Sequence, residues 1–332
     1  MISSIGVKIN HLKQVDSKTV LEWFSKISFK SLLFPLLGTL IFLMLWHVGA
    51  ARVNTSLGTF PGPVIVYEQW QSLVADHDRE RNKETAFYER QDVRNAKKLA
   101  QDANYVSKVR PYTGKPTFFD QIFTSLYTVL AGFILASVIA IPLGIIIGLN
   151  SSVYSALNPI IQIFKPVSPL AWLPLVTMVV SASYVSDNPM FSKSFLTSMF
   201  TVTLCCMWPT LINTAVGVAA IDKDLLNVSK VLQLKWVTHV KKIVIPSSIP
   251  MMFTGLRLSL GIAWMVLIAA EMLAQNPGLG KFVWDEFQNG SSNSLGRIMV
   301  AVLMIGFIGF MLDRAMLAFQ RYASWDKSQV LR

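Results

Sequence analysis

Long apolar runs alternate with polar segments along this chain. Six runs approach or exceed the length of about 20 residues with which a helix crosses the hydrocarbon core of a bilayer. They cover residues 32–51, 123–149, 156–181, 195–218, 247–273 and 298–319. One such run can be a buried helix of a soluble core, but six of them predict an all-α integral membrane protein with six transmembrane helices.

Two of these runs contain residues that affect how helices pack or continue. The second run contains Gly132, Ser137, Gly144 and Gly148, and small residues let helices approach closely in lipid. The third run is interrupted by prolines at 166, 169 and 174. Irregular backbone at membrane depth is tolerated where it lines a cavity.

The polar segment 52–120 separates the first run from the second. A helix-like apolar pattern from Pro63 to Leu73 precedes a charged stretch from Asp76 to Lys98. This order predicts an extramembrane helical hairpin, which either holds a partner protein or forms a solvated cap. The chain then divides into an N-terminal segment 1–31, a first span 32–51, the insertion 52–120, a five-helix core 121–319 and a tail 320–332.

The distribution of charge predicts the orientation. Segments 1–31, 150–155, 219–246 and 320–332 hold thirteen Lys and Arg, whereas the short loops 182–194 and 274–297 hold three. Loops rich in Lys and Arg stay in the cytoplasm, so both termini are predicted inside and 52–120 in the periplasm. The net charge of +11 then reflects topology rather than nucleic-acid binding. The length of the first run favours an uncleaved anchor over a cleaved signal peptide.

The segment 219–246 is the most informative loop on the predicted inner side. Asp222 and Asp224 stand where a helix would begin, because acidic residues suit the positive end of its dipole. One apolar face follows at Leu225, Val228 and Leu232, and a second short pattern at Trp236, Val240 and Ile243. Pro246 is expected to end this second pattern before the next span. Such amphipathic helices either lie in the membrane interface or dock a cytoplasmic partner.

This loop has the spacing of a known motif. In the permeases of ABC importers the motif reads Glu-Ala-Ala, three residues, Gly, nine residues and Ile-x-Leu-Pro. Here Asn227-Val228-Ser229, Gln233 and Ile243-x-Ile245-Pro246 occupy those positions. The Glu-Ala-Ala and Gly identities are replaced, while the spacing is kept.

The surrounding sequence resembles the nitrate/sulfonate/taurine branch of these permeases. The matching blocks are Pro166–Leu175, Trp208–Val218, Phe253–Trp264 and Ala269–Leu273. The last two blocks are similar to nitrate and bicarbonate permeases in particular. The resemblance covers about 120–320 and implies the type I ABC importer permease fold.

This resemblance implies a machine of several subunits in the bacterial inner membrane. Two permease copies pair around a central path, two cytoplasmic ATPase subunits each grip a coupling helix, and a periplasmic substrate-binding protein delivers the cargo. The expected coupling residues are Asp222, Asp224, Leu225, Asn227, Val228, Ser229, Leu232 and Gln233.

Catalysis and cofactor binding are expected to belong to the partners. ATP and Mg would bind the ATPase subunits, because Gly278-Leu279-Gly280-Lys281 lacks the phosphate-loop spacing. The adjacent Cys205 and Cys206 lie in an apolar run without metal-ligand spacing. The permease itself is therefore expected to be no enzyme and to hold no cofactor or metal.

Nitrate, with nitrite, is the cargo that the resemblance favours. Bicarbonate, cyanate and alkanesulfonate or taurine are alternatives within the same machine. Outside this class, an ion-gradient-driven secondary anion transporter and a non-transporting membrane scaffold remain open.

Polar and aromatic groups inside the spans are the candidate contacts of the cargo. Arg257, Trp264 and Glu271 follow one another at seven-residue spacing and share one stripe of a helix. Arg257 attracts a passing anion, pairs with a carboxylate in the bundle or reaches lipid phosphate. Glu271 is expected to pair near the outer gate with Arg297. Trp172 lies among prolines and is predicted either to line the path or to pack between helices.

Overall fold

The computed structural model describes residues 29–323, apart from 56–57, 103–104, 186–189 and 292. Most of the predicted segment 1–31 and residues 324–332 of the predicted tail lie outside the described residues. The chain forms two units, Met1–Ile65 and Val66–Arg332.

The first unit contains one apolar helix and one short hairpin. Helix α2 spans Phe29–Ala50, and strands β1 (Asn54–Thr55) and β2 (Gly58–Thr59) pair in antiparallel fashion. Nearly all described side chains of α2 are exposed. An apolar helix with no apolar neighbours is suited to lipid, which agrees with the first predicted span.

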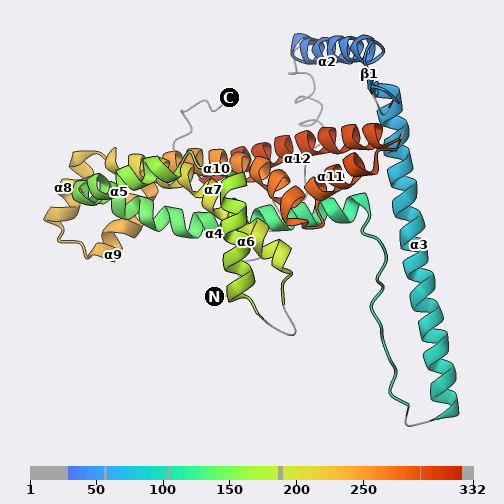
Figure 1. Cartoon of the computed structure of the whole chain (residues 1–332). Coiled ribbons are helices and arrows are strands. Elements are labelled where there is room, and N and C mark those ends of the chain that lie inside the picture. Colours follow the sequence, from blue (N-terminus) through green and yellow to red (C-terminus); the bar gives the residue numbers. More distant parts are fainter. Residues whose placement is uncertain (1–28, 56–57, 103–104, 186–189, 292, 324–332) are drawn as a thin grey trace, which may run out of the picture. The chain divides into compact units, whose positions relative to one another are not determined.

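The regular elements of the second unit are all helices in its described part (Figure 1). Its helices are α3 (Pro63–Gln101, whose first residues belong to the first unit), α4 (Phe118–Leu149), α5 (Ser151–Phe164), α6 (Pro169–Ser183), α7 (Lys193–Ala219), α8 (Lys223–Val231), α9 (Trp236–His239), the π-helix η2 (Val240–Val244), α10 (Ile245–Ala274), α11 (Leu279–Asn289) and α12 (Ser294–Ala323). Five described helices, counting α2 and the continuous α9–η2–α10, are long and apolar enough to span a membrane. The pair α5 and α6, bent by 99°, makes a sixth span if it is counted as one.

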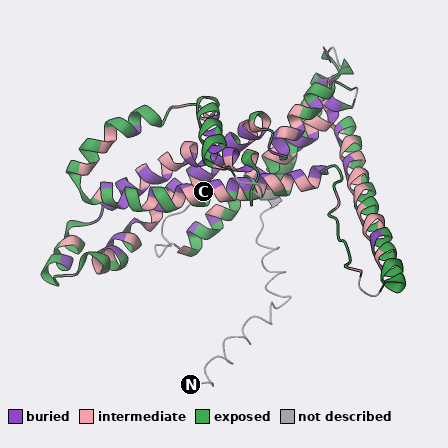
Figure 2. Ribbon diagram, turned by 60° about the horizontal axis from the view of Figure 1, so that its bottom comes forward, coloured by how far each residue is buried: buried purple, intermediate pink, exposed green. Residues whose placement is uncertain are grey.

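Helix α7 lies between α4 and α10 at the centre of this unit. Glycines allow the close approach, as the sequence predicts. A Cβ on Gly132 would stand 2.8 Å from Cγ1 of Val202, and one on Gly144 would stand 2.7 Å from Cβ of Thr214. Figure 2 shows the buried residues along the sides on which the long helices face one another.

Prolines shape the bent pair α5–α6. Helix α5 ends at Phe164, and α6 begins with Pro169 in its first turn, capped by the Ser168 side chain, which accepts a hydrogen bond from the Leu170 N–H. Proline suits the first turn because its missing N–H would be unpaired there. In α7, by contrast, the helix continues through Pro209.

The predicted hairpin in the insertion is wrong. One helix of 39 residues, α3, runs through both the apolar and the charged stretch, and the described residues 105–117 that follow contain no helix. Ion pairs one turn apart, such as Arg79–Asp76 and Lys83–Glu80, support the charged half. The sequence pattern was misleading because the helix continues after its apolar face ends at Leu73.

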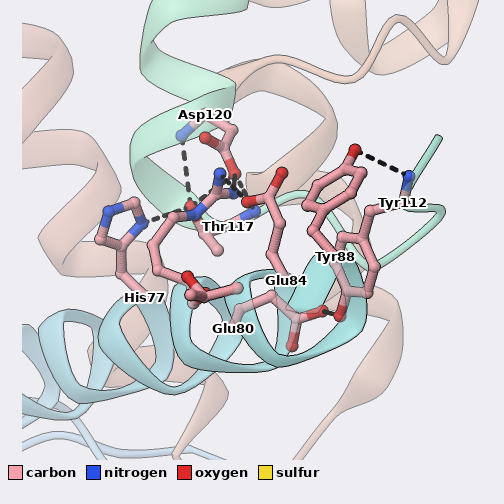
Figure 3. A network of polar contacts seen from close by, with 9 residues as sticks. His77, Glu80, Glu84, Tyr88, Tyr112, Thr117 and Asp120 are labelled. Atoms are coloured by element: carbon pink, nitrogen blue, oxygen red, sulfur yellow. Dashed lines mark hydrogen bonds and ion pairs between the residues drawn. The ribbon is translucent and has the colours of Figure 1, made fainter. Parts of the chain in front are cut away.

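The chain returns along α3 and enters α4 through a polar network (Figure 3). Thr117 and Asp120 form a capping box at the start of α4, and the Thr117 hydroxyl lies 2.8 Å from Nδ1 of His77 on α3. The Tyr112 hydroxyl donates a hydrogen bond of 2.7 Å to Glu80. This bond lowers the pKa of the Glu80 carboxyl below its usual value.

Candidate coupling surface and translocation path

Helix α8 begins where the sequence predicts. Asp222 is its N-cap, and its Oδ1 accepts a hydrogen bond of 2.9 Å from the Asp224 N–H. Asp224 lies in the first turn and Lys230 in the last. Each charge therefore faces the end of the helix dipole that it stabilises.

The predicted apolar face of α8 is uncovered in the described chain. The side chains of Leu225, Val228 and Leu232 are 45%, 51% and 62% exposed, and Asn227 beside them is exposed as well. Beside α8, Ile221 is buried in a cluster with residues of α4, α7 and η2. Exposed apolar side chains on one helix face are a common feature of interaction sites.

A tight turn follows α8 and joins it to α9. Gln233 has a φ of 47°, and the N–H of the next residue, Leu234, bonds to the Ser229 carbonyl at 3.2 Å. Glycine adopts this left-handed conformation without the cost that a Cβ brings. The family motif has Gly at this position, and here the left-handed conformation is adopted by Gln233.

The Ser229 side chain ties this turn to α9. Its Oγ lies 2.7 Å from Nδ1 of His239, and Ser229 is buried. Beyond α9, the chain runs through η2 directly into α10. The expectation that Pro246 ends the pattern is therefore wrong. Pro246 lies in the first turn of α10, where its missing N–H is tolerated.

Arg257 forms an ion pair inside the helix bundle. Its Nε lies 2.5 Å from Oδ1 of Asp313 and its Nη2 lies 3.0 Å from Oδ2. The two side chains are 32% and 34% exposed. This pair joins α10 to α12 and is the contact with a carboxylate that the sequence offered as one interpretation of Arg257.

Trp264 also faces α12. Its Nε1 donates a hydrogen bond of 2.9 Å to the Ile305 carbonyl, and the side chain is 5% exposed. A Cβ on Gly309 would stand 3.1 Å from the indole, so this glycine leaves room for the ring. Arg257 and Trp264 therefore share a stripe, as predicted, and the stripe packs against a neighbouring helix.

Glu271 is fully buried and its predicted pairing with Arg297 is wrong. The carboxylate accepts hydrogen bonds from the Ser125 hydroxyl at 2.8 and 2.9 Å and from the Gly280 N–H at 2.9 Å. The Ser125 Oγ in turn accepts from the Leu279 N–H at 2.8 Å. The Gly280 N–H in the first turn of α11 and the Ser125 hydroxyl thus hold the carboxylate, and no cation is in contact with it among the described residues.

The motif Gly278-Leu279-Gly280 forms the socket for this carboxylate. A Cβ on Gly278 would collide with the carboxylate itself, and one on Gly280 with the Ile268 carbonyl. Lys281 at the end of the motif pairs with Asp285 one turn later. These contacts explain why glycine occupies positions 278 and 280, and no bound phosphate is needed to account for the motif.

Arg297 belongs to a second network that the sequence did not indicate. Its guanidinium lies 3.0 Å from Asp76 on α3 and 3.4 Å from Glu286 on α11. Ser294 also donates to Glu286, at 2.9 Å. Asp76 lies 221 positions from Arg297 in the chain, so no local pattern in α12 indicates this contact.

Trp172 lies on α6 beside the bend. Its ring stacks on Phe164 of α5 with centroids 5.8 Å apart. It lines an apolar groove of about 570 Å³ together with residues of α6 and α7 such as Val176, Tyr184 and Phe200. Among the described residues its Nε1 has no hydrogen-bond partner.

The chain is similar to known membrane transport proteins. The model of the family described as "binding-protein-dependent transport system inner membrane component" matches residues 140–324. The bicarbonate transport system permease protein CmpB of Synechococcus elongatus is 32% identical over 302 residues, covering 91% of this chain and 92% of that protein. The nitrate import permease protein NrtB of the same species is 36% identical over 214 residues, covering 61% of this chain and 72% of that protein.

A solved structure supports the fold. A chain of the methionine ABC transporter MetNI in inward-facing conformations aligns with a TM-score of 0.52 at 13% identity, covering 62% of this chain and 96% of that chain. The helical architecture is thus that of an ABC importer permease. With the family model matching more than half of its length, the chain belongs to the binding-protein-dependent transport system inner membrane components.

Proposed function

We propose that this chain is the permease subunit of an ATP-driven importer that carries nitrate, and nitrite, from the periplasm to the cytoplasm. Two copies pair around the path. Two separate ATPase subunits bind ATP and Mg and grip α8, and a periplasmic binding protein delivers the anion. The permease itself carries out no catalysis and holds no cofactor.

The observation that carries this proposal is the uncovered apolar face of α8. Leu225, Val228 and Leu232 are exposed, although α8 itself is anchored by Ser229 and the neighbouring Ile221. A folded element that leaves apolar side chains in water is completed by a partner. The spacing of the importer motif and the family of the chain support an ATPase subunit as that partner.

The proposed topology follows from the charge distribution. Both termini and the loop 219–246 lie in the cytoplasm, the first span is 32–51, and the insertion 52–120 lies in the periplasm. The core 121–319 contains the path. The excess of Lys and Arg in the inner segments supports this orientation.

Bicarbonate is the second candidate cargo. The bicarbonate permease aligns with nearly the whole chain, whereas the nitrate permease is slightly more identical over a shorter part. Both ions are small monovalent oxyanions. The blocks around 253–264 and 269–273 are similar to both kinds of permease, and nitrate is placed first because the nitrate permease has the slightly higher identity.

The decisive experiment reconstitutes the chain in liposomes with its ATPase subunits and binding protein. ATP hydrolysis is measured with nitrate, nitrite, bicarbonate, cyanate and taurine. Stimulation by nitrate and not by bicarbonate supports the proposed cargo, and the reverse result replaces it. Nitrate flux without any associated ATPase, driven by an ion gradient alone, would overturn the importer class in favour of a secondary transporter.

We propose further that Arg257 acts as a structural tie rather than as an anion contact. Because its charge is neutralised by Asp313, Arg257→Ala and Asp313→Ala should both loosen α10 from α12 by similar amounts. The double variant should lose less than the sum of the two, since neither charge is left unpaired. If only Arg257→Ala abolishes anion-stimulated hydrolysis, Arg257 contacts the anion.

A further inference from the structure

The two halves of α3 are built differently. The half near the core is anchored to it, because the Asp76 carboxylate and the Ser72 hydroxyl lie 3.0 and 3.3 Å from Arg297 of α12. The ring of Trp70 packs edge-on against Phe118 and Phe119 of α4. The second half, from about residue 86, packs against the returning segment 105–117.

The returning segment clamps this second half along its length. Gln91 accepts a hydrogen bond from the Arg110 N–H at 2.8 Å and donates one to the Arg110 carbonyl at 3.5 Å. Asn95 donates to the Lys108 carbonyl at 3.1 Å, and the Tyr88 hydroxyl accepts from the Tyr112 N–H at 3.1 Å. A helix of 39 residues, about 58 Å long at 1.5 Å per residue, is thereby held as a stiff arm.

A basic stripe runs along the outer part of this arm. Arg90, Arg94 and Lys97 are exposed and follow one another at spacings of four and three, which places them on one face. Lys108 and Arg110 of the returning segment add two more exposed basic side chains. The acidic residues Glu89 and Asp92 fall about 100° or more around the helix from Arg90.

The stripe is unneutralised, in contrast to the basic residues near the core. Arg79, Arg81 and Lys83 each have a carboxylate partner within 3.1 Å. Within the described part of the chain, Arg90, Arg94 and Lys97 have none. Cations that the chain itself does not pair are available to an acidic partner.

We propose that the basic stripe Arg90–Arg94–Lys97 docks an acidic surface of the substrate-binding protein. This inference rests on the proposed function, which places the arm in the periplasm where that protein arrives. Complementary charge steers such an encounter and fixes its register. The clamp to the returning segment orders the stripe beforehand, so that little freedom is lost on binding.

A protein surface fits the stripe better than a lipid surface. Helices that lie in the membrane interface present a continuous apolar face. On this half of α3 the exposed apolar residues Val93 and Leu99 lie about 120° apart around the helix. Basic segments that bind lipid headgroups act at the anionic cytoplasmic leaflet, opposite to the predicted side of the arm.

The test uses the assembled complex in nanodiscs and its purified binding protein. In the variant Arg90→Glu/Arg94→Glu/Lys97→Glu the affinity for the binding protein should fall at least tenfold at low salt. The salt dependence of the affinity should flatten, while ATP hydrolysis without binding protein stays unchanged. A variant with three Gln at these positions should show an intermediate loss, and its neutral side chains guard against misfolding of the arm.

The opposite flank provides the matched control. Glu89→Gln/Asp92→Asn changes two exposed charges on the same helix and should leave the affinity unchanged or slightly increase it. Wild-type affinity and salt dependence in the triple-Glu variant would overturn the proposal. An effect present in phosphatidylglycerol nanodiscs and absent in phosphatidylcholine nanodiscs would assign the stripe to lipid and overturn it as well.

The experiments can overturn the docking proposal and the transport proposal independently of each other. If the wild-type complex binds the binding protein through the stripe but no tested anion stimulates hydrolysis, the docking is supported and the cargo is wrong. If the wild type hydrolyses ATP in response to an anion and the triple-Glu variant does so equally with equal affinity, the docking is wrong and the importer stands. Absence of any binding by the wild type overturns both.

Discussion

Two turns on either side of the long helix α10 share one local geometry and differ in almost everything else. In the turn between α8 and α9, Gln233 has a φ of 47°, and in the turn between α10 and α11, Gln275 has a φ of 56°. These are the two non-glycine residues with positive φ in the described chain. Each lets the chain leave a helix and enter another within a few residues.

The α10–α11 turn is fixed by the chain itself. Glu271 holds the start of α11, and Asn276, 1% exposed, donates a hydrogen bond of 3.2 Å to Thr128. The α8–α9 turn is exposed, and its described side-chain bond is the one between Ser229 and His239. The α10–α11 turn is therefore complete without a partner, whereas the α8–α9 turn presents apolar side chains for one.

Replacing Glu271 should have the largest effect, because it removes the centre of the fixed turn. In Glu271→Ala the Ser125 hydroxyl and the Gly280 N–H lose their acceptor in a buried site. Each buried group left unpaired costs about 1–3 kcal/mol, so the protein should lose about 3 kcal/mol or more of stability. Thermal unfolding in nanodiscs measures this. Glu271→Gln keeps an acceptor and should lose less; equal stability of the Ala variant and the wild type would contradict the assigned contacts.

Replacing Val228 should leave the fold intact and weaken the partner contact. Val228 is 51% exposed, so Val228→Asp removes little internal packing. A charge at the centre of a docking surface should weaken co-purification of the ATPase subunit about tenfold or more. Val93→Asp is the matched control, because Val93 is 56% exposed but lies on α3. An equal loss in both variants would indicate a general defect.

Replacing Gln233 by glycine should have a smaller effect and of opposite sign. No side-chain hydrogen bond of Gln233 is present among the described contacts, and a left-handed residue with a Cβ costs roughly 1–2 kcal/mol. Glycine relieves this strain but loses more conformational freedom on folding, which offsets part of the gain. Gln233→Gly should therefore stabilise the turn by about 1 kcal/mol. Gln233→Ala keeps the Cβ and should gain nothing. A destabilised Gly variant would mean that the Gln side chain has a contact in the assembled complex.

Sequence reasoning succeeded where the signal is local. Apolar length predicted the five continuous spans, and Asp222 predicted the start of α8. It failed where partners come from distant elements. The seven-residue spacing correctly placed Glu271 below Trp264 on α10, but no spacing within α10 indicates that Ser125 of α4 and the N–H groups of α11 meet there.

The wrong prediction of a helical hairpin in the insertion 52–120 has a different cause. Apolar periodicity ends at Leu73, yet α3 continues to Gln101. Beyond that point ion pairs along the helix and hydrogen bonds from the returning segment, such as those of Gln91, replace apolar packing. A reading based on apolar faces alone ends a helix too early wherever polar contacts support it.

The smallest effect is expected at Gln275, and it is the sharpest test of the comparison. Gln275→Gly relieves the same left-handed strain as Gln233→Gly, worth roughly 1 kcal/mol. Here, however, Nε2 of the glutamine donates a hydrogen bond of 2.6 Å to the Met272 carbonyl, a contact worth about 1 kcal/mol. The two terms offset each other, so the stability of Gln275→Gly should stay within about 0.5 kcal/mol of wild type in the same unfolding assay. A gain equal to that of Gln233→Gly would mean that the side-chain bond contributes nothing, and that both turns are governed by backbone strain alone.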